Sequence, residues 1–301
     1  MPYPLVYSII LNNNRREDTL QCLASLSRNT YPNHKMIVLD NQSTDDSVTV
    51  IQSVYPEVQI IRLEKNLGYA GNNNIGIEIA MKQGADWIFV LNDDTILDEN
   101  CLAKLVEVGE SDPKIGILGP LVYHHSEPTV IQSAGGMLGK YWQSIHLGKD
   151  EPDQGQFDLP HPVEWISGCA ILGRREAIER AGMLDSSFFL YWEETEWCVR
   201  VARAGWKIFN VPQAHIWHKG VQRNYEPKPY FTYYGTRNHL CILEKHHAPL
   251  QVKLYVWINY IRTITSWSLK PKWNKRREHR NAMVLGIIHF LQHRSGQMPS
   301  R

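Results

Sequence analysis

The sequence predicts an α/β protein that is built on a doubly wound sheet and carries a helical extension at its C-terminal end. Short apolar runs alternate with helical patterns through the first third of the chain, and each run ends in polar residues. Helical patterns return after about residue 230. Alternating strands and helices favour a parallel sheet with helices on both faces, because each crossover helix packs back onto the sheet.

The individual elements follow from the spacing of apolar residues. Continuous apolar runs predict buried strands, since helices cover both faces of a parallel strand. These runs lie at residues 6–11, 36–39, 58–63, 87–91 and 165–172. Helices are predicted around Leu20–Leu26 and near 47–54, 74–82, 174–181 and 193–204. Residues 123–165 resemble hairpins and loops, and two or three helices follow Tyr230 with breaks at Pro249 and Pro271.

Length and composition limit the class of protein. A chain of 301 residues corresponds to one large domain or two ordinary ones. Its 43% hydrophobic and 21% charged residues are typical of a globular protein and exclude a disordered or collagen-like chain. A net charge of +1 argues against a dedicated nucleic-acid binder, which usually carries a basic surplus.

The near-zero net charge hides an asymmetry along the chain. Residues 221–301 carry 14 Lys and Arg against 3 Asp and Glu, so residues 1–220 carry 18 against 28. We therefore expect a catalytic domain over 1–220 and a basic helical extension over 221–301. Residues 270–277 mix basic and aromatic side chains, which suits either an anionic membrane surface or a solvated basic face. The oligomeric state stays open, with a homodimer among the alternatives.

Cysteine usage and hydropathy indicate the compartment. Five scattered cysteines form no C-x-x-C pair, so neither a zinc knuckle nor a redox dithiol is predicted, and a reducing compartment is favoured. The N-terminus lacks the pattern of a signal peptide, and no run approaches the roughly 20 apolar residues that span a bilayer. We expect a cytoplasmic protein, with peripheral attachment to the inner face of the plasma membrane as an alternative.

The polar residues that end the predicted strands outline a site at one edge of the sheet. Ligands of open α/β sheets bind outside the carboxyl ends of the strands. No G-x-G-x-x-G follows the first strand and no P-loop motif occurs, which disfavours dinucleotide and P-loop nucleotide binding.

Three clusters could carry chemistry, and each also has a purely structural interpretation. The adjacent carboxylates of Asp93 and Asp94 suit a hard divalent cation, but also a turn or a helix cap. Three glutamates at 193, 194 and 196 follow an aromatic run that could desolvate a general base, but also complement a helix dipole. His215 and His218 do not form H-E-x-x-H, and a lone His is more often structural.

An ordered set of motifs is similar to family 2 glycosyltransferases of the GT-A fold, on their rhamnosyltransferase-like branch. The stretches that carry the resemblance are SIILNNNRREDTLQCLASL, IVLDNQSTDDS, NLGYAGNNNIGI, FVLNDDTILD, SAGGMLG, the segment from WISGCAILG to AHIWHKG, and YYGTRN. They cover about residues 5–240 in order. The resemblance implies a GT-A type mixed sheet and transfer of a sugar from a nucleotide-diphosphate sugar.

The resemblance also implies a role for each matching residue on the donor side. Asp40 corresponds to the Asp that hydrogen-bonds the nucleobase. The surrounding nucleotide pocket would be lined by Asn12, Asn41, Ser43 and Asp45. The loop that borders the base and the sugar diphosphate would contribute Asn66, Gly68 and Asn73. The segment that faces the transferred sugar would contribute Trp165, Ser167 and Gly168.

The remaining roles concern the metal and the base. Asn92 and Asp93 match the start of the D-x-D motif, with Asp93 near the ribose and diphosphate. Asp94 would bind Mg²⁺ or Mn²⁺, and His218 matches the histidine that closes the metal site. Glu194 matches the catalytic base, and Glu196 the acidic residue two places further on.

Two departures from the family pattern concern charge and reach. Asn92 replaces the first Asp of D-x-D, which reduces the negative charge offered to a metal. The base position holds Glu where relatives commonly have Asp, so the carboxylate lies one methylene further from the backbone.

The sequence therefore predicts an inverting, metal-assisted glycosyltransferase with one carboxylate base. The resemblance favours dTDP-L-rhamnose as donor and a saccharide or lipid-linked glycan as acceptor. Two alternatives stay open: an inactive saccharide-binding or nucleotide-binding scaffold on the same fold, and a sugar nucleotidyltransferase. The second is disfavoured because Asn12–Asn14 and Arg15 follow the first strand without glycines. Arg237 could serve the phosphates or the acceptor.

Overall fold

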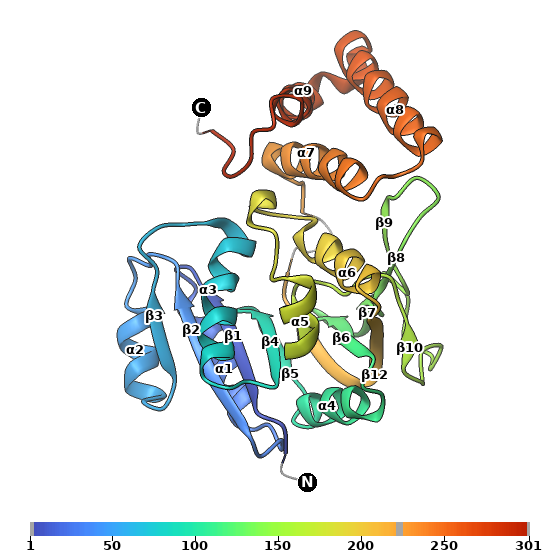
Figure 1. Ribbon diagram of the computed structural model, residues 1–301. Coiled ribbons are helices and arrows are strands. Elements are labelled where there is room, and N and C mark those ends of the chain that lie inside the picture. Colours follow the sequence, from blue (N-terminus) through green and yellow to red (C-terminus); the bar gives the residue numbers. More distant parts are fainter. Residues whose placement is uncertain (1–2, 221–224, 300–301) are drawn as a thin grey trace.

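The computed structural model describes residues 3–220 and 225–299, so residue 221, where we expect the extension to begin, lies outside the described residues. Within these ranges a ten-stranded mixed sheet forms the centre of the molecule (Figure 1). Its eight-strand path runs in the order β10 (His161–Pro162), β12 (Lys207–His218), β6 (Ile115–His124), β11 (Ala170–Arg174), β4 (Trp87–Asn92), β1 (Val6–Asn12), β2 (His34–Asp40) and β3 (Gln59–Arg62). Two short strands lie beside this path, β5 (Thr95–Leu97) on β12 and β7 (Glu127–Ser133) on β6.

The register of the parallel strands brings their polar ends together. β1 pairs in parallel with β2 and β4, while β11 runs antiparallel to β4. Asn12 at the end of β1 lies opposite Asp40 at the end of β2, and Leu11 lies opposite Asn92 at the end of β4. The predicted doubly wound mixed sheet is confirmed, and its carboxyl edge carries the polar residues.

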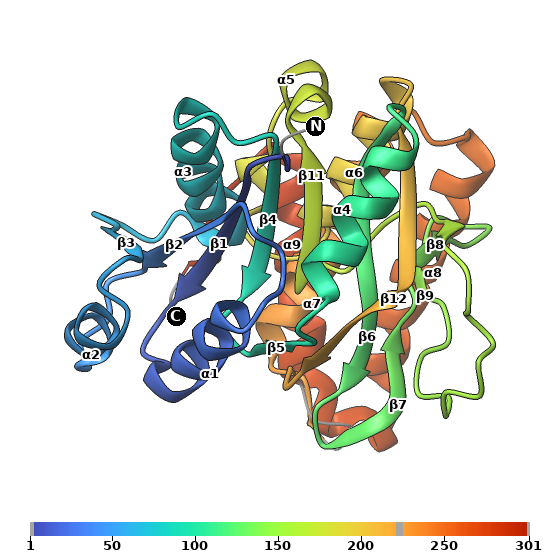
Figure 2. The ribbon, with the colours of Figure 1, turned by 90° about the horizontal axis from the view of Figure 1, so that it is seen from below.

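Helices cover both faces of the sheet (Figure 2). One face packs against α1 (Arg16–Ser27), α2 (Ser47–Val54) and α4 (Cys101–Ser111). The other face packs against α3 (Gly68–Lys82), α5 (Arg175–Ala181) and α6 (Glu193–Arg203). These two apolar layers are the core of the catalytic part.

The structure shifts some predicted elements and adds others. α3 begins at Gly68 rather than near residue 74, because Asn66 accepts a hydrogen bond from the Gly68 amide and turns the chain into the helix. α4, β6 and β12 have no counterpart in the predicted elements. β6 contains Gly116, Gly119 and a proline that break its apolar run, and a Cβ on Gly119 would lie 2.2 Å from Ile166.

Three helices form the C-terminal part of the chain. They are α7 (Pro229–Lys245), α8 (Leu250–Leu269) and α9 (Arg277–Leu291), so the predicted breaks at Pro249 and Pro271 are confirmed. A hairpin of β8 (Gly136–Leu138) and β9 (Ser144–His146) extends from the catalytic part toward them (Figure 1). At its tip the ring of Tyr141 stacks on Tyr255 of α8 with 3.4 Å between centroids.

Helix α7 holds the loop 186–192, which leads into α6. The side-chain amide of Asn238 lies within hydrogen-bond distance, 2.8–2.9 Å, of three carbonyls, those of Phe188, Leu190 and Tyr191. Arg237 is 1% exposed, and its Nη2 donates to the Phe188 carbonyl at 2.7 Å. Arg237 therefore has a structural role and is not available to phosphates or an acceptor.

The same loop contains backbone strain that these contacts must offset. Phe189, Tyr191 and Trp192 adopt positive φ angles of 63°, 64° and 75°, which cost energy for residues with a side chain. The Phe189 carbonyl also accepts a hydrogen bond from the Tyr69 amide of α3 at 2.7 Å. A loop between two helices is thus forced into one conformation, and α6 begins directly after it.

We predict that Asn238→Ala destabilises the protein by about 2–4 kcal/mol, because the carbonyls of Leu190 and Tyr191 lose the Asn238 donor and the Phe188 carbonyl keeps only Arg237. Equilibrium unfolding in urea measures this free energy. Asn281→Ala on the exposed side of α9 is the matched control and should change stability by less than about 0.5 kcal/mol. Equal stability of the two variants would show that α7 does not hold the loop.

Candidate active site

A polar cavity lies at the carboxyl end of β2. Its volume is about 450 Å³, and its lining consists of Asp40, Gln42, Ser43, Asp45, Val48, Thr49, Arg62 and Leu63. The buried amide of Asn12 donates to Asp40 Oδ1 and to Ser43 Oγ, both at 3.0 Å. Asp45 is exposed and accepts hydrogen bonds from Ser47, which lower the pKa of its carboxyl group. The structure therefore brings four of the residues expected in the nucleotide pocket to one place.

Two residues expected on the donor side have a buried amide oxygen without a hydrogen-bond partner among the described residues. These oxygens are Oδ1 of Asn41 and Oδ1 of Asn73. A buried polar atom without a partner costs free energy, so these oxygens are suited to accept hydrogen bonds from a ligand. Asn66 is exposed, and its side-chain oxygen accepts a hydrogen bond from the Gly68 amide at 2.8 Å. Gly68 itself allows close packing, since a Cβ would lie 2.2 Å from the Phe189 carbonyl.

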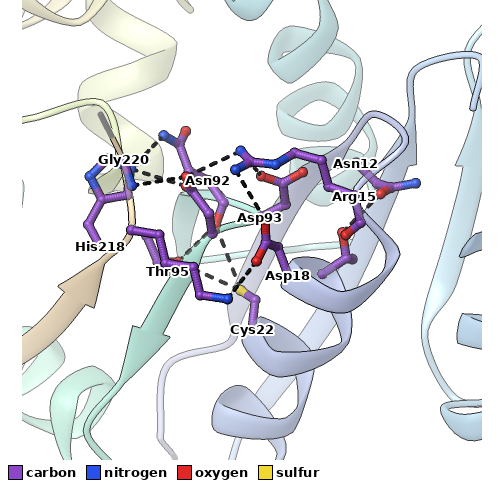
Figure 3. A network of polar contacts seen from close by, with 12 residues as sticks. Asn12, Arg15, Asp18, Cys22, Asn92, Asp93, Thr95, His218 and Gly220 are labelled. Atoms are coloured by element: carbon purple, nitrogen blue, oxygen red, sulfur yellow. Dashed lines mark hydrogen bonds and ion pairs between the residues drawn. The ribbon is translucent and has the colours of Figure 1, made fainter. Parts of the chain in front are cut away.

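Asp93 and Asp94 directly follow β4, and both carboxylates contact the side chain of Arg15. Figure 3 shows Arg15 beside Asp93. Arg15 Nη1 is 3.2 Å from both Asp93 Oδ1 and Asp94 Oδ2. The backbone amide of Gly220, which follows β12, donates to Asp94 Oδ2 at 3.1 Å. One positive side chain and one amide thus offset the repulsion between two buried carboxylates.

His218, at the end of β12, faces the same cluster. Its Nδ1 donates to Gln132 Oε1 at 2.7 Å, which leaves Nε2 directed at Asp94 Oδ1, 3.1 Å away. Asp94 Oδ1 is buried and has no hydrogen bond of regular geometry. Two electron-pair donors at this separation need a proton or a cation between them. The side-chain amide of Asn92 also lies 3.3 Å from His218 Nε2 and can donate to it. The Asp94–His218 pair would suit a divalent cation, because carboxylate oxygen and imidazole nitrogen are both common metal ligands.

The side chains alone form only part of a metal shell. Within residues 3–220 and 225–299, no group of three or more His, Cys, Asp and Glu side chains could hold a metal ion. Burial and the charge of Asp94 raise the pKa of Asp93 to about 7, against the opposite effect of Arg15. Burial also acts to raise the pKa of Asp94, but the contact with His218 and the charge of Arg15 outweigh it, and the net pKa is lowered. Asp94 is therefore the carboxylate that stays ionised.

Glu194 lies at the start of α6, beside the segment that precedes β11. A Cβ on Gly168 would lie 3.6 Å from the Glu194 side chain and 3.4 Å from the Tyr69 hydroxyl. Burial raises the pKa of Glu194 to about 7. Its neighbour Glu193 is 4% exposed, and burial raises its pKa well above the ordinary value. A carboxyl group that titrates near neutral pH is suited to proton transfer.

Glu196 points away from this place. It is fully buried, and its carboxylate binds three cationic or polar groups, Arg200 at 2.9 Å, Lys245 at 2.9 Å and His246 at 3.2 Å. Although burial opposes the change, these groups lower the pKa of Glu196 to about 2. Its carboxylate therefore joins α6 to the C-terminal helices.

The segment 165–168 also contains both a buried structural residue and residues that are partly exposed. Trp165 is 1% exposed and its Nε1 donates to the Met137 carbonyl at 3.2 Å, so its ring belongs to the core. Ser167 and Gly168 are partly exposed. The Ser167 hydroxyl donates to the thiol of Cys169 at 3.3 Å, and Gly168 borders Glu194.

Cys169 connects the cluster at β4 with Glu194. Its carbonyl accepts a hydrogen bond from the Asn92 amide at 3.0 Å. Burial raises the pKa of its thiol to about 12, and the charges of Asp94 and Glu194 act in the same direction. Both carboxylates therefore lie close enough to Cys169 for their charges to act on it.

Several side chains at this edge carry little signal in the sequence. Arg15 is recognisable only as a basic residue directly after the first polar strand end. Gln132, which orients His218, lies on β7 within a region predicted as hairpins and loops. Tyr69 donates to the Gly168 carbonyl and so links α3 to the segment beside Glu194.

Comparison with solved structures defines the class of protein. A mannosyltransferase of Pyrobaculum calidifontis, solved with GDP-Man and Mn²⁺, superposes with a TM-score of 0.63 at 13% identity, over 97% of this chain and 88% of that one. GalNAc-T7, solved with UDP, GalNAc and Mn²⁺, gives 0.65 at 15% identity, over 96% of this chain and 56% of that one. The chain has the GT-A fold.

Comparison of sequences then identifies the family. The profile of glycosyl transferase family 2 matches residues 8–182, so the chain belongs to this family and is a glycosyltransferase. An N-acetylglucosaminyl-diphospho-decaprenol L-rhamnosyltransferase of Mycobacterium tuberculosis is 29% identical over 76% of this chain and 82% of the relative. A dTDP-rhamnosyl transferase of Shigella flexneri is 24% identical over 83% of each chain. The predicted family and its rhamnosyltransferase-like branch are confirmed.

We predict that Arg15→Met increases the affinity for Mn²⁺ severalfold in the absence of nucleotide. The guanidinium already neutralises Asp93 and Asp94, so a bound cation must displace its charge. Calorimetric titration with Mn²⁺ alone measures the effect. Arg16→Met is the matched control, because Arg16 pairs with Glu17 and Asp46 instead. Unchanged or weaker affinity in Arg15→Met would show that Arg15 does not compete with the metal.

Proposed function

We propose that the protein is an inverting glycosyltransferase that moves a sugar from dTDP-L-rhamnose to a hydroxyl of a saccharide or lipid-linked glycan. The observation that carries the proposal is the order along one sheet edge: a polar cavity at β2, a carboxylate cluster at β4, and Glu194 beside Gly168. The choice of rhamnose and of a lipid-linked acceptor rests on the names of the two relatives.

The donor would lie along this edge with its nucleobase at β2. Asp40 would accept a hydrogen bond from the base, and Asn12 holds that carboxylate in place. Asn41 and Asn73 offer unpaired oxygens to the nucleotide. The diphosphate would then reach the cluster of Asp93 and Asp94.

Asp94 and His218 would hold Mg²⁺ or Mn²⁺. Both solved structures of the same fold contain Mn²⁺, and Oδ1 of Asp94 is buried with only His218 Nε2 facing it, at 3.1 Å. A divalent cation neutralises the charge that develops on the leaving diphosphate. Gln132 orients His218 for this contact, and the Gly220 amide fixes the second oxygen of Asp94.

Glu194 would act as the general base. Its ionised carboxylate takes the proton from the acceptor hydroxyl, whose oxygen attacks the anomeric carbon as the bond to the diphosphate breaks. A single base and direct displacement invert the configuration at that carbon. Two features support this assignment: the raised pKa of Glu194, and the place of Gly168 beside it. The buried Glu196 would position α6 rather than react.

The division of the chain follows from these roles. We assign donor binding and catalysis to residues 1–220, and we treat the basic helices of 221–301 as an appended unit that α7 anchors to the catalytic loop. With nucleotide sugar as donor and a lipid-linked acceptor, the enzyme would work at the cytoplasmic face of a membrane.

We predict that dTDP-L-rhamnose with Mg²⁺ or Mn²⁺ raises the melting temperature more than UDP-sugars or GDP-sugars do, because a ligand of the native state stabilises it. A thermal-shift panel tests the donor, and release of dTDP on addition of a glycan acceptor tests transfer. The inactive-scaffold alternative predicts stabilisation without release. If no nucleotide sugar stabilises the protein, the proposed function is wrong.

We predict that Glu194→Gln reduces transfer by about 10²-fold or more while donor affinity stays within about twofold. In the wild type, turnover should rise with pH through about 7, because Glu194 accepts a proton only when ionised and its pKa is raised to about 7. Assays of sugar transfer at a series of pH values measure both the loss of activity and the pH dependence of turnover. Glu57→Gln, at an exposed carboxylate, is the control and should keep the wild-type profile. Near-normal turnover of Glu194→Gln would exclude the base assignment.

A further inference from the structure

Helix α8 exposes large aliphatic side chains to solvent, in addition to the apolar residues that it buries. Its buried residues are Val252 and Val256. Its exposed residues include Leu254, Ile258 and Ile261, with 53%, 62% and 59% of their surface accessible. A surface helix normally turns its apolar stripe to the core and its charges outward. Here large aliphatic side chains lie on both sides.

The exposed residues form a continuous row. Leu250, Leu254, Ile258, Ile261 and Leu269 follow one another at spacings of three, four and eight positions. Spacings of three and four place side chains on one face of a helix. Twenty residues at about 1.5 Å each make the row about 30 Å long. A contiguous apolar surface of this kind marks an interaction site.

The charges around this row have a single sign. Between Leu250 and Arg277 the chain has seven Lys and Arg residues and neither Asp nor Glu. Among them, Arg262, Lys270, Lys272 and Lys275 are exposed. Trp267 and Trp273 are half-buried within the same stretch. Apolar, aromatic and basic side chains along one helix are the composition of a segment that lies in the interface of an anionic membrane.

We propose that α8 and the segment 270–277 dock the enzyme on an anionic lipid surface, with α8 lying in the plane of the headgroups. Charge favours this occupant over a second copy of the chain, because a symmetric dimer would bring two sets of seven cations together. No helix among residues 3–220 and 225–299 is long and apolar enough to cross a membrane, which agrees with an in-plane position.

The catalytic part lies on the other side of α7 (Figure 1). The stack of Tyr141 on Tyr255 joins the β8–β9 hairpin to α8, and Asn238 of α7 binds the loop before Glu193. The lipid-facing surface is therefore fixed in orientation relative to the candidate active site. Docking on lipid would bring the enzyme to the membrane that carries the proposed lipid-linked acceptor. In that respect the inference rests on the proposed function.

Vesicle co-sedimentation tests the proposal without donor or acceptor, so it can fail independently of the proposed function. The full chain is mixed with vesicles of phosphatidylcholine alone or with added phosphatidylglycerol. The wild type should sediment with the anionic vesicles and remain in solution with the neutral ones. A triple variant, Leu254→Gln with Ile258→Gln and Ile261→Gln, should lower the affinity for anionic vesicles by at least about tenfold. Lys272→Gln with Lys275→Gln should weaken binding and reduce its dependence on salt.

The control replaces exposed apolar residues elsewhere, Val54→Gln with Leu159→Gln, and should bind as the wild type does. Because all substituted side chains are exposed, circular dichroism and melting temperature should match the wild type in each variant. A wild type that stays in solution with anionic vesicles, or a triple variant that binds normally, would overturn the proposal. So would a lipid-free dimer in sedimentation velocity that the triple variant abolishes, since a second copy would then cover the row.

Discussion

The hydrogen bonds from Asn238 and Arg237 to the loop 186–192 are the constraint on which the candidate active site depends. The loop has three residues with positive φ. Without hydrogen bonds from outside the loop, it would relax to a backbone conformation of lower free energy. The loop leads directly into α6, where Glu194 lies, and its Phe189 carbonyl accepts a hydrogen bond from the Tyr69 amide in the first turn of α3. A helix late in the chain thus fixes a carboxylate and a glycine-rich turn that belong to the catalytic part.

This dependence explains why the fold was easier to predict than the site. Apolar runs predicted β1, β2, β3 and β4, although the residues of β3, at the edge of the sheet, are only half-buried or exposed. The apolar runs missed β6, whose sequence is interrupted by Gly119, a residue that packs closely against Ile166. The polar strand ends predicted the edge on which the site lies, since parallel strands in register end together.

The roles of single side chains could not be predicted from sequence spacing, because they depend on tertiary contacts. Glu194 and Glu196 are two residues apart on one helix and therefore face different surroundings: one borders Gly168, and the other is neutralised by Arg200, Lys245 and His246. Trp165 and Arg237 are large or charged residues within family motifs, yet both are buried structural groups. The resemblance indicated the right stretches, whereas the structure separates the residues that can meet a substrate from those that support them.

The two cysteines behind the carboxylate edge give the site a chemical property of its own. The Cys22 thiol lies 3.8 Å from the Asn92 carbonyl and 3.7 Å from the Thr95 hydroxyl, and the Cys169 carbonyl accepts a hydrogen bond from the Asn92 amide. Burial raises the pKa of both thiols to about 12. Thiolates, not thiols, react with oxidants and alkylating agents. Burial is therefore the main protection of these thiols, and the neighbouring carboxylates add to it. Modification of either thiol would report that this edge of the sheet has opened.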